Sequence, residues 1–235
     1  MNKFFFMLLS LVLLINLSGC SVMSQEECQL GQWYQIGLND GREGKEYLLS
    51  EYAEDCAEYQ IKVDANSFNQ GREEGLIDYC TYENGKQVGK LNLPYNSVCL
   101  GESSKAFLFG YTPYYNLASA KANLSSIQDK VNYYQGLVNK GEKKKESQAH
   151  LKQVKSDYKS AKTKVKKYKL NVVIHKLVKK IKDIDEKLLN NDDLSEEDKS
   201  SLESERAHLK NSLAFHSAKS NIKRIINLFG RFKTL

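Results

Sequence analysis

The chain has 235 residues, a formal net charge of +6 and charged side chains at 27% of its positions. This length allows one modest core with an extension, or two small domains, and excludes a large enzyme. The charge is uneven, because residues 21–115 hold 7 basic and 15 acidic side chains and residues 116–235 hold 27 basic and 14 acidic ones. The contrast predicts two units with different surfaces, the second able to meet anionic polymers or lipid headgroups. The alternative is that the lysines only solvate long helices.

The N-terminus has the pattern of a bacterial lipoprotein signal. Lys3 precedes an apolar run of about a dozen residues, too short for the roughly 20 that a transmembrane helix needs. Leu17-Ser18-Gly19-Cys20 follows as the cleavage box. We therefore predict a signal peptide over residues 1–19, a lipid-carrying (palmitate-type) anchor on Cys20 and a lipidated tether over residues 20–27. An ordinary secretory signal or an uncleaved anchor is the alternative.

The residue after the cysteine bears on localisation. This residue is Ser21 and not aspartate. In enteric-type bacteria a residue other than aspartate at this position favours the outer membrane over the inner one. The prediction is a lipid-anchored protein of the bacterial cell envelope, at the outer membrane and facing the periplasm.

The remaining cysteines agree with export. They form an even set, Cys28, Cys56, Cys80 and Cys99, so we predict two disulfides in an oxidising compartment. Three connectivities are open, and sequential pairing closes the shortest total loop length. Each bridge is expected to contribute on the order of 3 kcal/mol to stability.

Residues 28–110 are predicted to form a small, disulfide-held, glycine-rich helical module. Two stripes recur at helical spacing, one made of Trp33, Gly37, Gly41 and Gly44 and the other of Phe68, Gly71, Gly75 and Tyr79. Positions without a Cβ allow another backbone to come close, so we expect two helices packed through their glycine faces. For the first stripe the alternative is a turn at Asn39-Asp40-Gly41. Asn84-Gly85 is predicted to be a turn, because further glycines and Pro94 interrupt the residues that follow it.

Residues 111–235 are predicted to be a coiled-coil region, helical from about Tyr114 and forming a long antiparallel helical hairpin or a three-helix bundle. Asn139-Lys140-Gly141 separates two apolar series, and Ser195 is expected to cap a third helix that ends near Gly230. The first series contains Leu117, Ala120, Leu124, Ile127, Val131, Tyr134 and Val138. The second contains Leu151, Val154, Tyr158, Ala161, Val165, Tyr168 and Val172, then shifts phase to Ile174, Leu177, Ile181, Ile184 and Leu188. The third includes Leu202, Leu209, Leu213, His216, Ile222, Ile225, Ile226 and Phe229.

No catalytic, cofactor-binding or metal-binding motif is found in the sequence. All four histidines lie in the second half and the pairable cysteines in the first, without CxxC or HExxH spacing. Asp40, Asp64 and Glu73 could serve a small hydrolase, although solvated acidic faces explain them more simply. The densest basic runs are Lys143–Lys145 and Lys162–Lys169. Export argues against nucleic acid as their partner, and leaves an envelope protein, anionic lipid or cell-wall polymer.

The first half also resembles a known family. The order Trp33, Gly37, Asp40, Gly41 and Gly44, then Phe68, Gly71, Gly75, Leu76 and Tyr79, set among the four cysteines, resembles the bacterial lipoprotein family catalogued as domain of unknown function 2799. The likeness covers about residues 28–100, with Phe68 where tyrosine is expected. It implies an exported, lipid-anchored envelope protein and supplies no established activity. We expect a structural or interaction module and not an enzyme, with a small hydrolase or a redox-responsive inhibitor or sensor as the alternatives. The partner and the oligomeric state are open.

Overall fold

The computed structural model describes residues 22–191 and 193–220. Cys20, the signal peptide and the apolar positions predicted beyond residue 220 lie outside this range. The described residues form eight α-helices and no strand, which confirms the mostly helical fold class. They divide into two compact units, one of residues 22–81 and 95–106, the other of 82–94 and the described part of 107–220. The domain boundaries predicted from the sequence stay predictions.

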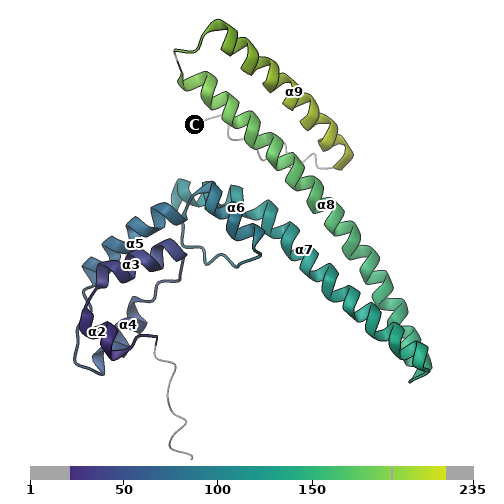
Figure 1. Cartoon of the computed structure of the whole chain (residues 1–235), viewed down its shortest axis with the longest axis horizontal. Helices are drawn as coiled ribbons and strands as arrows, with labels where there is room; N and C mark the ends of the chain where they lie inside the picture. The colour runs from purple at the N-terminus through teal and green to yellow at the C-terminus, as the bar shows by residue number, and fades with distance from the viewer. Residues whose placement is uncertain (1–21, 192, 221–235) are drawn as a thin grey trace, which may run out of the picture. The chain divides into compact units, whose positions relative to one another are not determined.

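The first unit contains four helices, which are α2 (Gln25–Leu30), α3 (Trp33–Glu43), α4 (Leu49–Ala57) and α5 (Ala65–Tyr79) (Figure 1). Local capping sets their ends. The Asp64 carboxylate caps α5 by accepting hydrogen bonds from the backbone N–H groups of Asn66 and Ser67. Gly44 ends α3 in the left-handed conformation, with φ at 63°. Both predicted helices are confirmed, and the alternative of a turn within α3 is wrong.

A small hydrophobic core holds the first unit together. It is made of Met23, Cys28, Trp33, Tyr52, Cys56 and Phe68. Phe68 lies at its centre, fully buried, with its ring edge-on to those of Tyr47 and Tyr52 at 5.9 Å. Because Cys28 and Cys56 belong to this core, their disulfide staples α2 to α4 from the inside.

The first described residues are already part of this unit. Asp55 on α4 accepts hydrogen bonds at one carboxylate oxygen from the backbone N–H of Val22, at 2.7 Å, and of Met23, at 2.9 Å. The Met23 side chain is buried in the core. The chain is therefore fixed from Val22 onward.

The second unit contains α6 (Tyr82–Lys90), most of α7 (Gly101–Lys140), α8 (Lys144–Asn190) and α9 (Glu196–Ser220). In Figure 1, α7 and α8 run side by side in opposite directions, and α9 folds back along the C-terminal part of α8. The predicted hairpin is confirmed, with its turn at Gly141, where φ is 77°. The N–H of Asp198 donates to the Ser195 hydroxyl, so the predicted cap of the third helix is also confirmed.

The phase shift predicted within α8 is a change of packing partner. Val172 and Ile174 are both buried. Before them the seam faces α7, where the Tyr134 ring stacks on His150 at 5.0 Å. After them, Ile181 and Ile184 form a cluster with Leu209 of α9. One helix thus serves two neighbours in succession.

His175 lies at this change of partner, with 3% of its surface exposed. Its Nε2 is 3.2 Å from the Tyr82 hydroxyl of α6, and its ring centre is 4.4 Å from that of Phe109 on α7. Burial, together with the positive charges of Lys179 and Lys86, lowers the pKa of His175 to about 4. The imidazole is therefore neutral in the folded protein near neutral pH.

Two predictions about the middle of the chain are wrong. Asn84-Gly85 is not a turn, because both residues lie within α6. The next helix does not begin near Tyr114 but at Gly101, and it continues through Pro113. Packing explains both errors, since a Cβ on Gly85 would lie 2.2 Å from the Phe107 carbonyl oxygen and one on Gly110 would lie 2.1 Å from that of Tyr82. This close packing of α6 on α7 outweighs the turn propensity and the proline.

Candidate functional site

The glycine stripes bring the backbones of α3 and α5 into contact. A Cβ built on Gly37 would lie 2.0 Å from the Phe68 carbonyl oxygen, and one on Gly71 would lie 2.0 Å from that of Tyr34. Gly41 and Gly75 repeat this arrangement about one turn of each helix later. Backbone atoms cannot move aside as a side chain can, so any residue other than glycine would force the helices apart. The predicted glycine-face packing is confirmed.

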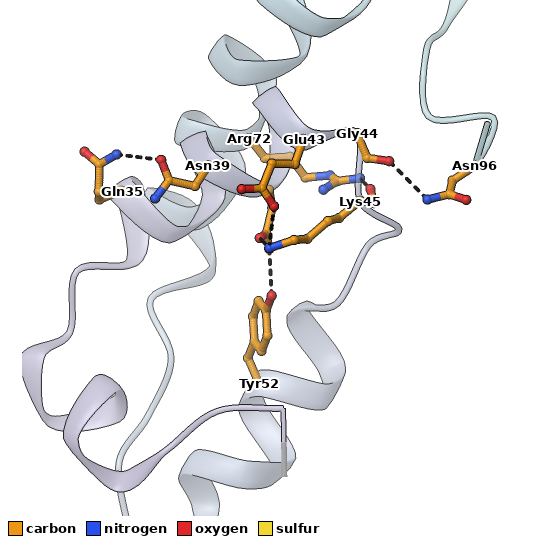
Figure 2. Close-up of polar contacts among 9 residues, drawn as sticks. Gln35, Asn39, Glu43, Gly44, Lys45, Tyr52, Arg72 and Asn96 are labelled. Carbon is orange, nitrogen blue, oxygen red and sulfur yellow. Dashed lines mark hydrogen bonds and ion pairs between the residues drawn. The ribbon is translucent and has the colours of Figure 1, made fainter. Parts of the chain in front are cut away.

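The last residues of the two stripes also meet. A Cβ on Gly44 would fall 2.1 Å from the Cζ atom of the buried Tyr79 ring, which therefore lies directly over the end of α3. The Gly44 carbonyl oxygen accepts a hydrogen bond from the Asn96 side chain at 3.2 Å (Figure 2). Gly44 thus satisfies two requirements at once, a left-handed backbone and space for an aromatic ring.

Asp40 is the one buried carboxylate among the motif residues, with 2% of its surface exposed. Its Oδ1 accepts a hydrogen bond from Lys45 Nζ at 3.0 Å, and its Oδ2 accepts one from the Tyr52 hydroxyl at 2.8 Å. Lys45 also pairs with Glu43 at 2.9 Å. The carboxylate therefore joins α3, the segment after it and α4, and both its oxygens are occupied.

Arg72 extends this cluster from α5. It is 6% exposed, its Nη2 donates to the Lys45 carbonyl oxygen at 2.6 Å, and its Cζ lies 5.6 Å from the centre of the Tyr47 ring. Figure 2 shows Arg72, Lys45 and Tyr52 converging from separate segments. Within the described residues, Arg72 Nη1 is a buried nitrogen without a hydrogen-bond partner. A guanidinium held this way is strongly directional and cannot be replaced by lysine.

The electrostatics of the cluster keep its groups in fixed protonation states. Burial, followed by the hydrogen bond to Asp40, raises the pKa of Tyr52 far above its ordinary range. Burial lowers the pKa of Lys45, but its hydrogen bonds to Glu43 and Asp40 outweigh that effect and leave the pKa raised. Near neutral pH the tyrosine is therefore neutral and the lysine charged, which are the states that their hydrogen bonds to Asp40 require.

The other acidic residues considered for hydrolysis do not join Asp40. Asp64 is exposed and caps α5. Glu73 is exposed as well. Asp78, a further acidic residue of α5, forms an exposed ion pair with Arg42 at 3.0 Å. The structure assigns Asp40, Asp64 and Asp78 to helix packing, capping and pairing.

The predicted disulfide cysteines pair sequentially, Cys28 with Cys56 and Cys80 with Cys99. All four are buried, with at most 6% of their surface exposed. A redox-responsive sensor needs a bridge that reductants can reach, and neither bridge offers one.

Sequence reasoning singled out Asp40 but missed Lys45, Tyr52 and Arg72. No short-range pattern links them, since they come from a loop and two different helices. One signal was available, because Arg72 directly follows Gly71 and so lies at the edge of the glycine face.

The described residues contain no group of three or more histidine, cysteine or acidic residues that could hold a metal ion. Among these residues, no helix has the length and apolar character that crossing a bilayer requires.

Comparison with known proteins gives one family. No curated protein and no solved structure matches the chain significantly. The model of one protein family matches residues 32–115, which include both glycine stripes and the Asp40 cluster. This match confirms the family resemblance over that segment, and the matching model is DUF2799, described as a protein of unknown function.

Proposed function

We propose that this protein is a lipid-anchored component of the bacterial cell envelope, at the periplasmic side of the outer membrane, and that it serves as a structural or interaction module. Cys20 provides the anchor, the disulfide-held unit forms a rigid base, and the helical hairpin presents its surface to a partner.

One observation carries the proposal. Every cysteine except Cys20 is paired in a buried disulfide. Stable structural disulfides are typical of exported proteins, and this leaves Cys20, within the cleavage box, as the single cysteine for acylation.

The anchor is tested by mass spectrometry of the protein purified from its own bacterium. We expect an N-terminal peptide that begins at Cys20 and carries acyl chains, and a Cys20→Ser variant that leaves the membrane fraction. An unprocessed N-terminus or an unmodified Cys20 would contradict the proposal.

The interaction role is tested by chemical crosslinking in intact cells, followed by affinity purification of the full chain. Envelope components should be recovered with the wild-type protein and reduced with Cys20→Ser, which lacks the anchor. Recovery of nothing above the background of an untagged strain would count against an interaction module.

A further inference from the structure

Six lysines follow a single line along α8. They are Lys152, Lys155, Lys159, Lys162, Lys166 and Lys169, named here the lysine row, and all six are exposed. Their spacing alternates between three and four residues, and each directly follows one residue of the apolar seam that packs against α7. A line in phase with a heptad seam stays on one flank of the hairpin. At 1.5 Å per residue the lysine row extends about 26 Å.

The line continues beyond Lys169. Val173, 41% exposed, takes one position, and Lys176 and Lys180 take the next two. Between Asp157 and Asp183 the sequence contains no acidic residue. From Lys152 to Lys180 the line therefore presents only positive charge over about 42 Å.

The neighbouring flank of α7 offers amides instead of carboxylates. Lys155 Nζ donates to Gln135 Oε1 at 3.1 Å, which identifies the α7 line that faces the lysine row. This line contains Ser125, Gln128, Asn132, Gln135 and Asn139. Coiled coils usually place opposite charges at such flanking positions. Here the row faces neutral hydrogen-bonding groups.

The other border of the lysine row is formed by small hydroxyl side chains of α8. Ser156, Ser160 and Thr163 are exposed there. Helices that lie in a membrane surface carry large apolar side chains next to their cationic ones, and these three positions carry small polar side chains instead. The surface therefore suits a hydrated anion better than a lipid bilayer.

Several other charged side chains of α8 have ion-pair or hydrogen-bond partners. Near its C-terminus Lys182 pairs with Glu186 at 3.7 Å, and Asp185 pairs with Arg206 of α9 at 3.1 Å. On the opposite flank Asp157 accepts a hydrogen bond from Gln153. Within the described residues no lysine of the row forms an ion pair. Like charges three and four residues apart repel each other, so the row costs helix stability, and no ion pair within the described residues offsets that cost.

We infer that the lysine row binds a linear phosphate-bearing polymer, with the α7 amides and the α8 hydroxyls hydrogen-bonding along it. Several lysines on one straight line neutralise successive phosphates and release their counterions, a source of affinity that depends steeply on salt. This inference rests on the proposed function and names the chemical class of one partner.

The test uses the purified full chain and linear polyphosphate immobilised through one end. The row variant changes all six lysines of the row to glutamine. The matched control changes six other exposed lysines to glutamine and so removes the same amount of charge. They are Lys140, Lys144, Lys145, Lys164, Lys182 and Lys187. Vesicles of phosphatidylcholine with phosphatidylglycerol, and of phosphatidylcholine alone, form the membrane arm.

We expect wild-type protein and the matched control to bind polyphosphate within about threefold of each other, and the row variant to bind at least about 30-fold more weakly. Raising salt from about 50 to 200 mM should weaken wild-type binding by on the order of 10²- to 10³-fold. The row variant should keep the helical circular-dichroism signal of the wild type. It should melt at no lower temperature than the wild type, because the repulsion between neighbouring lysines is removed.

Three results would overturn the inference. They are equal weakening in the two variants, absence of polyphosphate binding by the wild type, and binding to the anionic vesicles alone. None of them touches the proposed function, because crosslinking in cells reports on protein partners independently of this assay.

Discussion

Two of the helix pairs in this chain, α3 with α5 and α7 with α8, are assembled in different ways. α3 and α5 meet through backbone atoms at four glycines, whereas α7 and α8 meet through a seam of apolar side chains. A backbone contact leaves no freedom at the positions that form it, while a seam distributes its energy over many replaceable side chains. The difference predicts that adding one methyl group at a glycine contact strongly destabilises the first unit. In the hairpin, by contrast, single substitutions in the seam should be tolerated, so its exposed positions can vary to suit a binding surface.

The largest expected effect is a single methyl group on the glycine contact. Gly71→Ala places a Cβ 2.0 Å from the Tyr34 carbonyl oxygen, so we expect a loss of about 3 kcal/mol or more. Trp33, the single tryptophan and buried in this unit, reports its unfolding in urea by fluorescence. Gly136→Ala on α7 is the matched control, since no atom lies within 4 Å of that position. It should stabilise the hairpin by up to about 1 kcal/mol. Equal effects of the two changes would remove the distinction between the helix pairs.

The disulfides should matter in the same unit. Replacing Cys80 and Cys99 together by serine opens a loop with a sequence separation of 19 residues. We expect a loss of about 3 kcal/mol, because the unfolded chain regains conformational freedom. The measurement is again the urea midpoint of Trp33 fluorescence. Hydrogen exchange of α8 amides should change little, and equal loss of protection there would contradict separate units.

Asp40→Asn tests the buried cluster. The amide keeps the shape but removes the charge that pairs with Lys45, and we expect a loss of about 2 to 3 kcal/mol. Asp78→Asn, at an exposed ion pair with Arg42, is the control and should change stability by less than about 0.5 kcal/mol. A double-mutant cycle with Tyr52→Phe measures the coupling, which should be clearly different from zero. Additive losses would show that the hydrogen bond contributes nothing.

The hairpin should instead respond to pH through His175. Its pKa is about 4 in the folded protein, against an ordinary value of 6.5, so the unfolded chain binds the proton more readily. Its contribution to stability is therefore complete above about pH 6.5 and is lost as the pH falls toward 4. We expect a loss of about 2 kcal/mol over that interval, measured by hydrogen exchange of α8 amides. His175→Phe should flatten the dependence, and His150→Gln, at an exposed site, should leave it unchanged.

Interactions between residues close in the sequence were predicted more successfully than those between residues far apart in it. Features that depend on residues close together in one helix could be predicted from the sequence alone. These are the heptad series, the Ser195 cap and the first glycine stripes. The same glycine contact at Gly85 and Gly110 was missed, because Asn84-Gly85 has strong turn propensity and was predicted to be a turn. The Asp40 cluster was missed in part because its members meet only after α3, α4 and α5 have packed.

The two hydrogen bonds from Val22 and Met23 to Asp55 bear on the proposed membrane anchor, because they fix the chain shortly after Cys20 in the sequence. With a lipid on Cys20, as proposed, a single residue, Ser21, lies between the anchored cysteine and Val22, whose amide is the first one fixed, a reach of at most about 7 Å. The first unit would then lie close to the lipid headgroups with little freedom to turn. Its far side would always point away from the bilayer, so the anchor would dictate orientation as well as address.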